Sequence, residues 1–221
     1  MQKLLLLSFV LTAMAMTSIQ KTRIVFFGDS ITQAGVQNGG YIDLISQGIQ
    51  QRSAGDKYEL IGAGIGGNKV YDLYLRLDDD VLARKPDLVV IYVGINDVWH
   101  KTSSGTGTDL DKYEKFYIAI IKKLQANNIK VAVCTPTVIG ELKNNANPQD
   151  KDLNAYSEVI RRLAATYQCK LIDLRKAFAD YIQQNNKDNK ESGLLTTDRV
   201  HLTPAGNKLV AEEMTKALSI K

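Results

Sequence analysis

His201 and Asp198 are the residues whose types and spacing best suit proton transfer. The chain has only two histidines, His100 and His201, so the candidates for a general base are few. Asp198 precedes His201 by three residues, and in a turn this spacing lets the carboxylate hold one ring nitrogen and stabilise the imidazolium. Thr203 and Pro204 follow and predict a helix start, so we expect the imidazole in a short loop. The open alternative is a surface pair beside a helix cap.

Ser30 is the candidate nucleophile, because it follows an apolar run directly. Residues 24–27, Ile-Val-Phe-Phe, are typical of a strand buried on both faces, and the run stops at Gly28. At the carboxyl end of a buried parallel strand, Ser30 would lie at the rim where α/β folds bind ligands. By itself Gly-Asp-Ser is equally typical of a turn and a helix cap. The partners elsewhere in the chain therefore decide between the two interpretations.

Asn96 supplies the kind of donor that acyl transfer needs. It follows the apolar run 88–93, and a neutral amide can stabilise a developing oxyanion without a charge that would trap the ground state. His100 lies in the same segment and also follows an aspartate, Asp97, by three residues. Since this segment already supplies the amide donor, we favour His201 as the base. We expect His100 and Trp99 to line the pocket from a loop.

The stretch Gly62–Gly67 matches the Gly-x-Gly-x-x-Gly pattern of dinucleotide-binding turns. That fingerprint also needs an acidic residue about 20 positions on, at the end of the next strand. The next apolar run ends at Gly94 without one, so we expect no cofactor. A better use of these glycines is a close backbone approach that offers the Gly67 N–H to an anion. No clustered Cys or His indicates a catalytic metal, and a purely structural calcium ion stays open.

Strand-like runs alternate with helix-like ones, which predicts a parallel sheet covered on both faces. The expected strands are Ile24–Phe27, Tyr58–Ala63, Leu88–Val93, Ile129–Cys134 and Lys170–Leu174. The expected helices are Tyr41–Ile49, Val70–Leu82, Leu110–Leu124, Leu153–Tyr167, Ala177–Ile182 and Pro204–Leu218. Three polar stretches, 101–108, 140–152 and 183–192, are expected to be loops. The first two leave the carboxyl ends of strands, on the same rim as Ser30.

The first residues are typical of a secretory signal. Met1–Lys3 carry a positive charge, Leu4–Met16 are almost wholly apolar, and Ala13-Met14-Ala15 offers a small-x-small cleavage site. The apolar run is shorter than the roughly 18 residues of a spanning helix, so stable membrane insertion is not expected. We assign residues 1–20 to a signal peptide with an unfixed cut site and 21–221 to a single domain. The mature protein is then expected to be secreted or periplasmic.

Charge and cysteine content narrow the partners further. The 221 residues carry a formal net charge of +4 with no basic block, so nucleic acid is not an expected partner. The two cysteines, Cys134 and Cys169, fall at opposite ends of two expected strands. Five residues at about 3.3 Å each would separate them by roughly 16 Å, beyond the reach of a disulfide. We therefore expect two free, buried thiols.

Taken together, four motifs resemble the GDSL, or SGNH, hydrolase family over about residues 23–217. They are Ser30 in Gly-Asp-Ser-Ile, Gly67 in the glycine-rich turn, Asn96 in Gly-x-Asn-Asp and His201 in Asp-x-x-His. The departures are small: Ile31 stands where leucine is usual, and Gly66 and Asn68 stand where the family often has Ser and Asp. An ordinary α/β-hydrolase is less similar, because no Gly-x-Ser-x-Gly elbow surrounds Ser30.

The resemblance implies a flavodoxin-like three-layer α/β/α sandwich with a five-stranded parallel sheet. It further implies Ser30 as nucleophile, His201 as base and Asp198 as the residue that orients the base. The Ser30 N–H, the Gly67 N–H and the Asn96 side chain would form the oxyanion hole. Asp29 joins Trp99 and His100 among the expected substrate-binding residues.

A serine esterase acting through an acyl-enzyme is the function that this set predicts. The polar rim stretches, and the lack of a long hydrophobic loop, favour short acyl groups such as acetyl on carbohydrate. The alternatives are a lysophospholipase or thioesterase acting on lipids, a non-catalytic carbohydrate-binding module on the same fold, and a phosphodiesterase. The expected partner is a small-molecule or carbohydrate ester, and the oligomeric state does not follow from the sequence.

Overall fold

The computed structural model describes residues 20–220, so the expected signal segment lies almost wholly outside the described residues. Its centre is a five-stranded sheet in the order β2-β1-β3-β4-β5, with every neighbouring pair parallel. The strands are β1 (Thr22–Gly28), β2 (Tyr58–Gly64), β3 (Leu88–Tyr92), β4 (Lys130–Cys134) and β5 (Lys170–Ile172). This is the flavodoxin-like strand order. The predicted fold class is confirmed.

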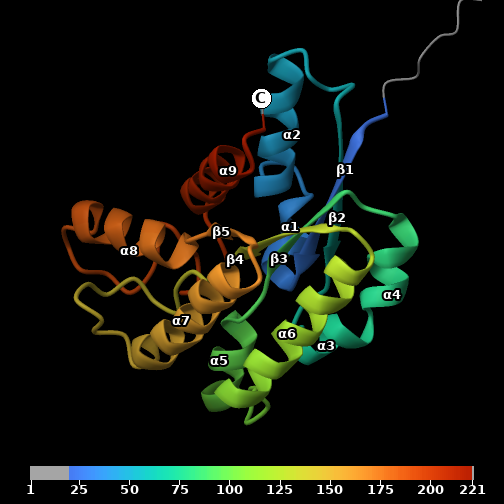
Figure 1. The fold of residues 1–221 in the computed structure, drawn as a ribbon. Helices are drawn as coiled ribbons and strands as arrows, with labels where there is room; N and C mark the ends of the chain where they lie inside the picture. The colour runs from blue at the N-terminus through green and yellow to red at the C-terminus, as the bar shows by residue number, and fades with distance from the viewer. Residues whose placement is uncertain (1–19, 221) are drawn as a thin grey trace, which may run out of the picture.

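Helices cover both faces of the sheet (Figure 1). They are α1 (Ser30–Gly35), α2 (Tyr41–Gln51), α3 (Val70–Leu75), α4 (Leu77–Asp80), α5 (Ile95–Ser103), α6 (Leu110–Ala126), α7 (Asp150–Thr166), α8 (Leu174–Asn185) and α9 (Pro204–Leu218), with a 3-10 turn η1 (Leu82–Arg84). Right-handed crossovers put α2 on one face and α3, α6 and α7 on the other. Helix α9 returns to the first face and packs against α2.

The inner strands β1, β3 and β4 are apolar over most of their length because both faces of the sheet are buried there, whereas the edge strands β2 and β5 are only partly buried. In β1 the side chains of Val25, Phe26 and Phe27 are fully buried, as are Val89, Val90 and Ile91 of β3. A strand buried on both sides does not alternate between apolar and polar residues. The order of the sheet also places the carboxyl end of β1 between those of β2 and β3, the position where open α/β sheets bind ligands.

Two helices that the sequence analysis did not predict, α1 and α5, follow β1 and β3 directly. Conversely, the helix predicted over residues 70–82 is divided into α3, α4 and η1. Arg76 lies between α3 and α4 with φ −103° and ψ 9°, and its Nη2 donates to the carbonyls of Gly28 (2.8 Å) and Ala63 (3.0 Å). The aspartates of α4 then begin a new helical turn, where negative charge suits the helix N-terminus.

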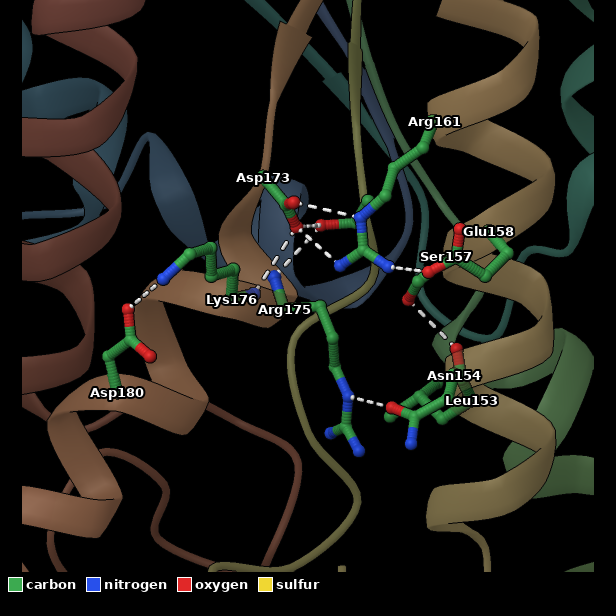
Figure 2. Close-up of polar contacts among 10 residues, drawn as sticks. Leu153, Asn154, Ser157, Glu158, Arg161, Asp173, Arg175, Lys176 and Asp180 are labelled. Carbon is green, nitrogen blue, oxygen red and sulfur yellow. Dashed lines mark hydrogen bonds and ion pairs between the residues drawn. The ribbon is translucent and has the colours of Figure 1, made fainter.

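The stretches expected as loops are partly helical. Residues 101–103 belong to α5, 150–152 to α7 and 183–185 to α8. An ion pair joins helix α7 to the start of α8: Arg161 of α7 contacts Asp173, the N-cap of α8, through Nε at 2.8 Å (Figure 2). Asp173 also accepts from the Thr135 hydroxyl at 3.0 Å and caps α8. In the described part of the chain, no helix is long and apolar enough to cross a membrane.

Both cysteines are free, as predicted, but only one of them is buried. Cys134 ends β4 in the core, whereas Cys169 precedes β5 at the sheet edge and is half-buried, so the expectation of two buried thiols is wrong for Cys169. The register pairs Cys134 with Ile172, three residues after Cys169. The offset along the strands is therefore about 10 Å, shorter than expected and still beyond disulfide reach.

Candidate active site

Ser30, His201 and Asp198 meet in one hydrogen-bonded chain although 171 positions separate the serine from the histidine. The Ser30 hydroxyl lies 3.0 Å from Nε2 of His201, and Nδ1 of the same ring lies 2.7 Å from Oδ2 of Asp198. Burial tends to raise the pKa of Asp198. The hydrogen bonds it accepts from His201 and Val200 outweigh this effect, so the pKa of Asp198 lies below its usual value. The carboxylate therefore stays ionised beside the imidazole.

The Asp198–His201 segment is a tight turn held by its own backbone. Oδ1 of Asp198 accepts from the N–H groups of His201 (2.8 Å) and Val200 (3.1 Å). Arg199, between Asp198 and Val200, has φ +80°. Thr203 then caps α9 by accepting from the Gly206 N–H at 3.1 Å, with Pro204 in the first turn. The predicted helix start after the histidine is confirmed, and it fixes the direction in which the ring projects.

Ser30 is the first residue of α1, and two features of the chain before it bring it to the sheet rim. A Cβ at Gly28 would lie 2.3 Å from the Tyr92 carbonyl oxygen, so only glycine lets β1 end this close to β3. Asp29 is the N-cap and accepts from the Ile31 N–H at 3.0 Å. Expected among the substrate-binding residues, the Asp29 side chain instead lies beneath the helix and is 2% exposed. Burial raises the pKa of Asp29 to about 7, and the nearby Asp97 carboxylate adds to the effect.

Three candidate donors lie at the ends of β1, β2 and β3. Within the described residues, the N–H groups of Ser30 and Gly67 have no protein acceptor. Gly67 has φ +76°, a conformation that suits glycine, and the neighbouring Gly66 N–H is bound by Gln33 Oε1 at 2.9 Å. Asn96 lies in the first turn of α5 and donates one amide hydrogen to the Asn68 carbonyl at 3.0 Å. This bond orients the amide and leaves its second hydrogen unused.

Asp97, next to Asn96, links the segment that follows β3 to the segment that follows β2. It is fully buried, and its carboxylate accepts from the Val70 N–H at 3.2 Å, just beyond the glycine-rich turn. Burial raises the pKa of Asp97 to about 6. Because its carboxylate lies in the core, the second Asp-x-x-His sequence forms no aspartate–histidine pair, unlike the first. In the sequence Asp97 stands out only as part of that second motif, and no sequence signal predicts its contact with Val70.

Trp99 and His100 lie on helix α5, not in a loop as expected. The Trp99 ring meets the His201 ring edge-on, with centroids 6.3 Å apart, and also lies against His100 at 5.6 Å. Burial and the charge of Lys69 lower the pKa of His100. The two aromatic side chains thus form a wall beside the Ser30–His201 pair. Over residues 20–220, no group of three or more Cys, His, Asp or Glu side chains is placed to hold a metal ion.

The protein has a parallel sheet between two layers of helices, with hydrogen-bonded serine, histidine and aspartate side chains at the carboxyl rim of the sheet. These features define its class, a hydrolase of the three-layer α/β type. The chain belongs to the GDSL-like lipase/acylhydrolase family, whose sequence model matches residues 26–209. It is accordingly a carboxylic ester hydrolase. Both the family and the enzyme class are those that the sequence analysis indicated.

Individual relatives align over nearly the whole domain. A solved structure of an acetyl xylan esterase, AlAXEase, is 59% identical, with a TM-score of 0.88 over 89% of this chain and 99% of that one. An acetylxylan esterase of Geobacillus stearothermophilus is 26% identical over 90% of this chain and 94% of its own length. A lipoprotein of Bacillus subtilis, YqeF, is likewise 26% identical and covers 86% of each chain.

Proposed function

We propose that Ser30, His201 and Asp198 hydrolyse the ester through an acyl-enzyme. The observation that carries this proposal is the unbroken chain of contacts from the Ser30 hydroxyl through both ring nitrogens to the Asp198 carboxylate. His201 Nε2 takes the hydroxyl proton as Ser30 attacks the carbonyl carbon, and Asp198 stabilises the imidazolium. His201 then gives that proton to the departing alcohol. A water molecule, activated by the same nitrogen, releases the carboxylic acid and restores Ser30.

The oxyanion formed in each half of the reaction is held by the Ser30 N–H, the Gly67 N–H and the Asn96 side chain. Two observations support these three donors. Each has an N–H hydrogen that binds no acceptor in the described residues, and each lies at the end of one of three adjacent strands. Fixed donors of this kind stabilise charge where it develops and need no reorganisation during the reaction. The Asn68 carbonyl keeps the Asn96 amide in place between turnovers.

Acetyl groups on carbohydrate are the proposed substrate class. The 59% identical structure is that of an acetyl xylan esterase, and the G. stearothermophilus relative is also named an acetylxylan esterase. Trp99 fits this class, because an aromatic ring beside the catalytic histidine can pack against the apolar face of a sugar. His100, on the same wall, would contact the sugar or its acetyl group.

Ser30→Ala tests the nucleophile and the substrate class together. We expect it to abolish acetate release from acetylated xylo-oligosaccharides and to prevent labelling by a fluorophosphonate probe. The matched control is Ser104→Ala, which removes an exposed hydroxyl at the end of α5 and should leave both unchanged. Turnover by Ser30→Ala at the wild-type rate would disprove the nucleophile assignment. A strong preference of the wild type for octanoate over acetate esters would disprove the short-acyl proposal and favour a lipid substrate.

We also propose that residues 1–20 are a signal peptide and that residues 21–221 form the mature, exported domain. The apolar segment and the small-x-small site support this proposal, and the family relative YqeF is named a lipoprotein. Expression of the full chain in a bacterial host, followed by mass measurement of the extracytoplasmic protein, tests it. Recovery of a protein that still begins at Met1 would contradict the proposal.

A further inference from the structure

Glu141 is a fully buried carboxylate in the segment that follows β4, a part of the chain that the sequence analysis assigned to a polar rim loop. Within the described residues, every hydrogen bond that its carboxylate accepts comes from one short segment, residues 194–196. Oε2 accepts from the Leu194 N–H at 2.9 Å. Oε1 accepts from the Leu195 N–H at 2.8 Å, from the Thr196 hydroxyl at 2.6 Å and from the Thr196 N–H.

Backbone bonds join the same two segments on either side of this carboxylate. The Gly140 N–H donates to the Arg199 carbonyl at 2.8 Å, and the Glu141 N–H donates to the Glu191 carbonyl at 2.9 Å. Arg199 lies inside the turn that carries Asp198 and His201. Gly140 has φ +103°, and a Cβ there would lie 2.2 Å from Asn147 Oδ1, so this contact depends on glycine. The segment after β4 therefore serves as the support for residues 191–199.

The path from Glu141 to the proposed base is short and is made of hydrogen bonds. Thr196, which Glu141 binds through both its N–H and its hydroxyl, pairs with Leu202 in an isolated antiparallel bridge. The next residue, Thr197, donates its N–H to the His201 carbonyl at 2.7 Å. Together these bonds close the turn between Thr196 and Leu202, with Asp198 and His201 at its tip. A shift of Thr196 would move the whole turn relative to Ser30.

The chemistry of Glu141 suits this task. Within the described residues no Lys, Arg or His side chain pairs with it, although burying an ionised carboxylate without partners is costly. Its negative charge is instead satisfied by the dipoles of four donors, and charge-assisted bonds of this kind are stronger than neutral ones. An irregular segment with no helix or strand of its own is thereby held in a single conformation.

We propose that Glu141 is a positioning residue that sets the distance and direction of the His201 ring relative to Ser30. This inference rests on the proposed function, because it needs His201 and Asp198 to take part in the reaction. Glu141 itself touches neither Ser30 nor the imidazole. It acts through Thr196 and the turn that follows.

Glu141→Ala and Glu141→Gln test the proposal, with Asp173→Asn as the matched control. Asp173 is also a hydrogen-bonded acid at the carboxyl rim of the sheet, held by Arg161 and by the Lys176 N–H at the N-terminus of α8 (Figure 2). The Thr135 hydroxyl also donates to it. Its loss should lower stability without touching residues 191–201. Because small misplacements of reacting groups are costly, we expect Glu141→Ala to lower kcat on an acetate ester about 100-fold with little change in KM. Glu141→Gln keeps the oxygen that binds Leu195 and Thr196, so it should restore much of the loss.

A second readout is the dependence on Asp198. If Glu141 acts through the turn, Glu141→Ala made on top of Asp198→Ala should lower kcat far less than it does in the wild type, because residues that act as a unit are not additive. The effect of Asp173→Asn on kcat, in contrast, should be the same fold-change in the wild type and in Asp198→Ala. Thr196→Val, which loses one of the four donors, should show a smaller effect of the same kind.

The proposal is overturned if Glu141→Ala folds and keeps kcat within about twofold of the wild type, or if its effect multiplies fully with that of Asp198→Ala. Should Glu141→Ala not fold, Thr196→Val decides, because it removes one donor to the Glu141 carboxylate: an effect on kcat no larger than that of Asp173→Asn overturns the proposal. A failure of the proposed function looks different, since Ser30→Ala or Asp198→Ala would then retain wild-type turnover.

Discussion

Replacement of Asp29 by asparagine should change how the stability of the protein depends on pH. Burial raises the pKa of this carboxyl from 3.8 to about 7. The folded protein therefore holds a proton that the unfolded chain releases, and the stability gained from it is complete below pH 4. This contribution to stability is lost as the pH rises through 7. Asparagine does not titrate, and its side-chain oxygen can still accept the N-cap hydrogen bond from Ile31.

The shift in the pKa of Asp29 sets the expected change in the free energy of unfolding. About three pH units, at 1.36 kcal/mol for each, correspond to roughly 4 kcal/mol in the free energy of unfolding. The Asp29→Asn variant should therefore gain stability relative to the wild type as the pH rises, with more than half of the change between pH 5 and pH 8. This is a large fraction of the 5–15 kcal/mol typical of a domain.

Urea unfolding at pH 5, 6, 7 and 8 measures this difference directly. The control is Asp56→Asn, whose side chain is 96% exposed in the wild type and should follow the wild-type pH dependence. Activity should be retained in Asp29→Asn, because the cap that places Ser30 is preserved. If wild type and Asp29→Asn lose stability in parallel from pH 5 to pH 8, Asp29 does not carry the proton and the reasoning from burial fails.

Three further predictions concern the site and its frame. Asn96→Ala should lower kcat on the order of 100-fold or more, with the urea midpoint almost unchanged, because it removes one oxyanion donor. Asp198→Asn should lower kcat/KM while fluorophosphonate still labels Ser30 slowly; labelling and turnover at wild-type rates would contradict its role. Arg175→Met should cost about 3–5 kcal/mol in urea unfolding, because it leaves Asp150 buried without its 2.7 Å partner; a loss below 1 kcal/mol would show that this pair is not a buried ion pair.

The inner strands β1, β3 and β4 could be predicted from the sequence because each is a short apolar run that is almost wholly buried. No periodicity had to be recognised in residues such as Val25 and Phe26, only a run of the right length. The helices α1 and α5 could not be predicted in the same way. Their buried faces include Thr32, bound by the Tyr41 hydroxyl at 3.0 Å, and Asp97, bound by the Val70 N–H. Polar residues buried by such partners break the amphipathic pattern on which a prediction depends.

Some residues in and around the candidate site could likewise be predicted from the sequence, and others could not. Asp198 and His201 were found because a carboxylate–imidazole pair three residues apart is a local pattern. Glu141 was not found, since its partners are mainly backbone N–H groups, which every sequence supplies, and its own segment contains the polar residues of a surface loop. A buried acid of this kind leaves no signal in a single sequence. Only the packing of residues 194–196 against the segment after β4 reveals it.

The two free thiols bear on how the enzyme can be produced. Neither cysteine is cross-linked, and burial raises the pKa of both thiols, so little reactive thiolate forms at neutral pH. Folding of residues 21–221 therefore needs no oxidant, foldase or isomerase for sulfur chemistry. The domain should reach its native state in the reducing cytoplasm of an expression host as well as outside the cell, and dithiothreitol should leave its melting temperature unchanged.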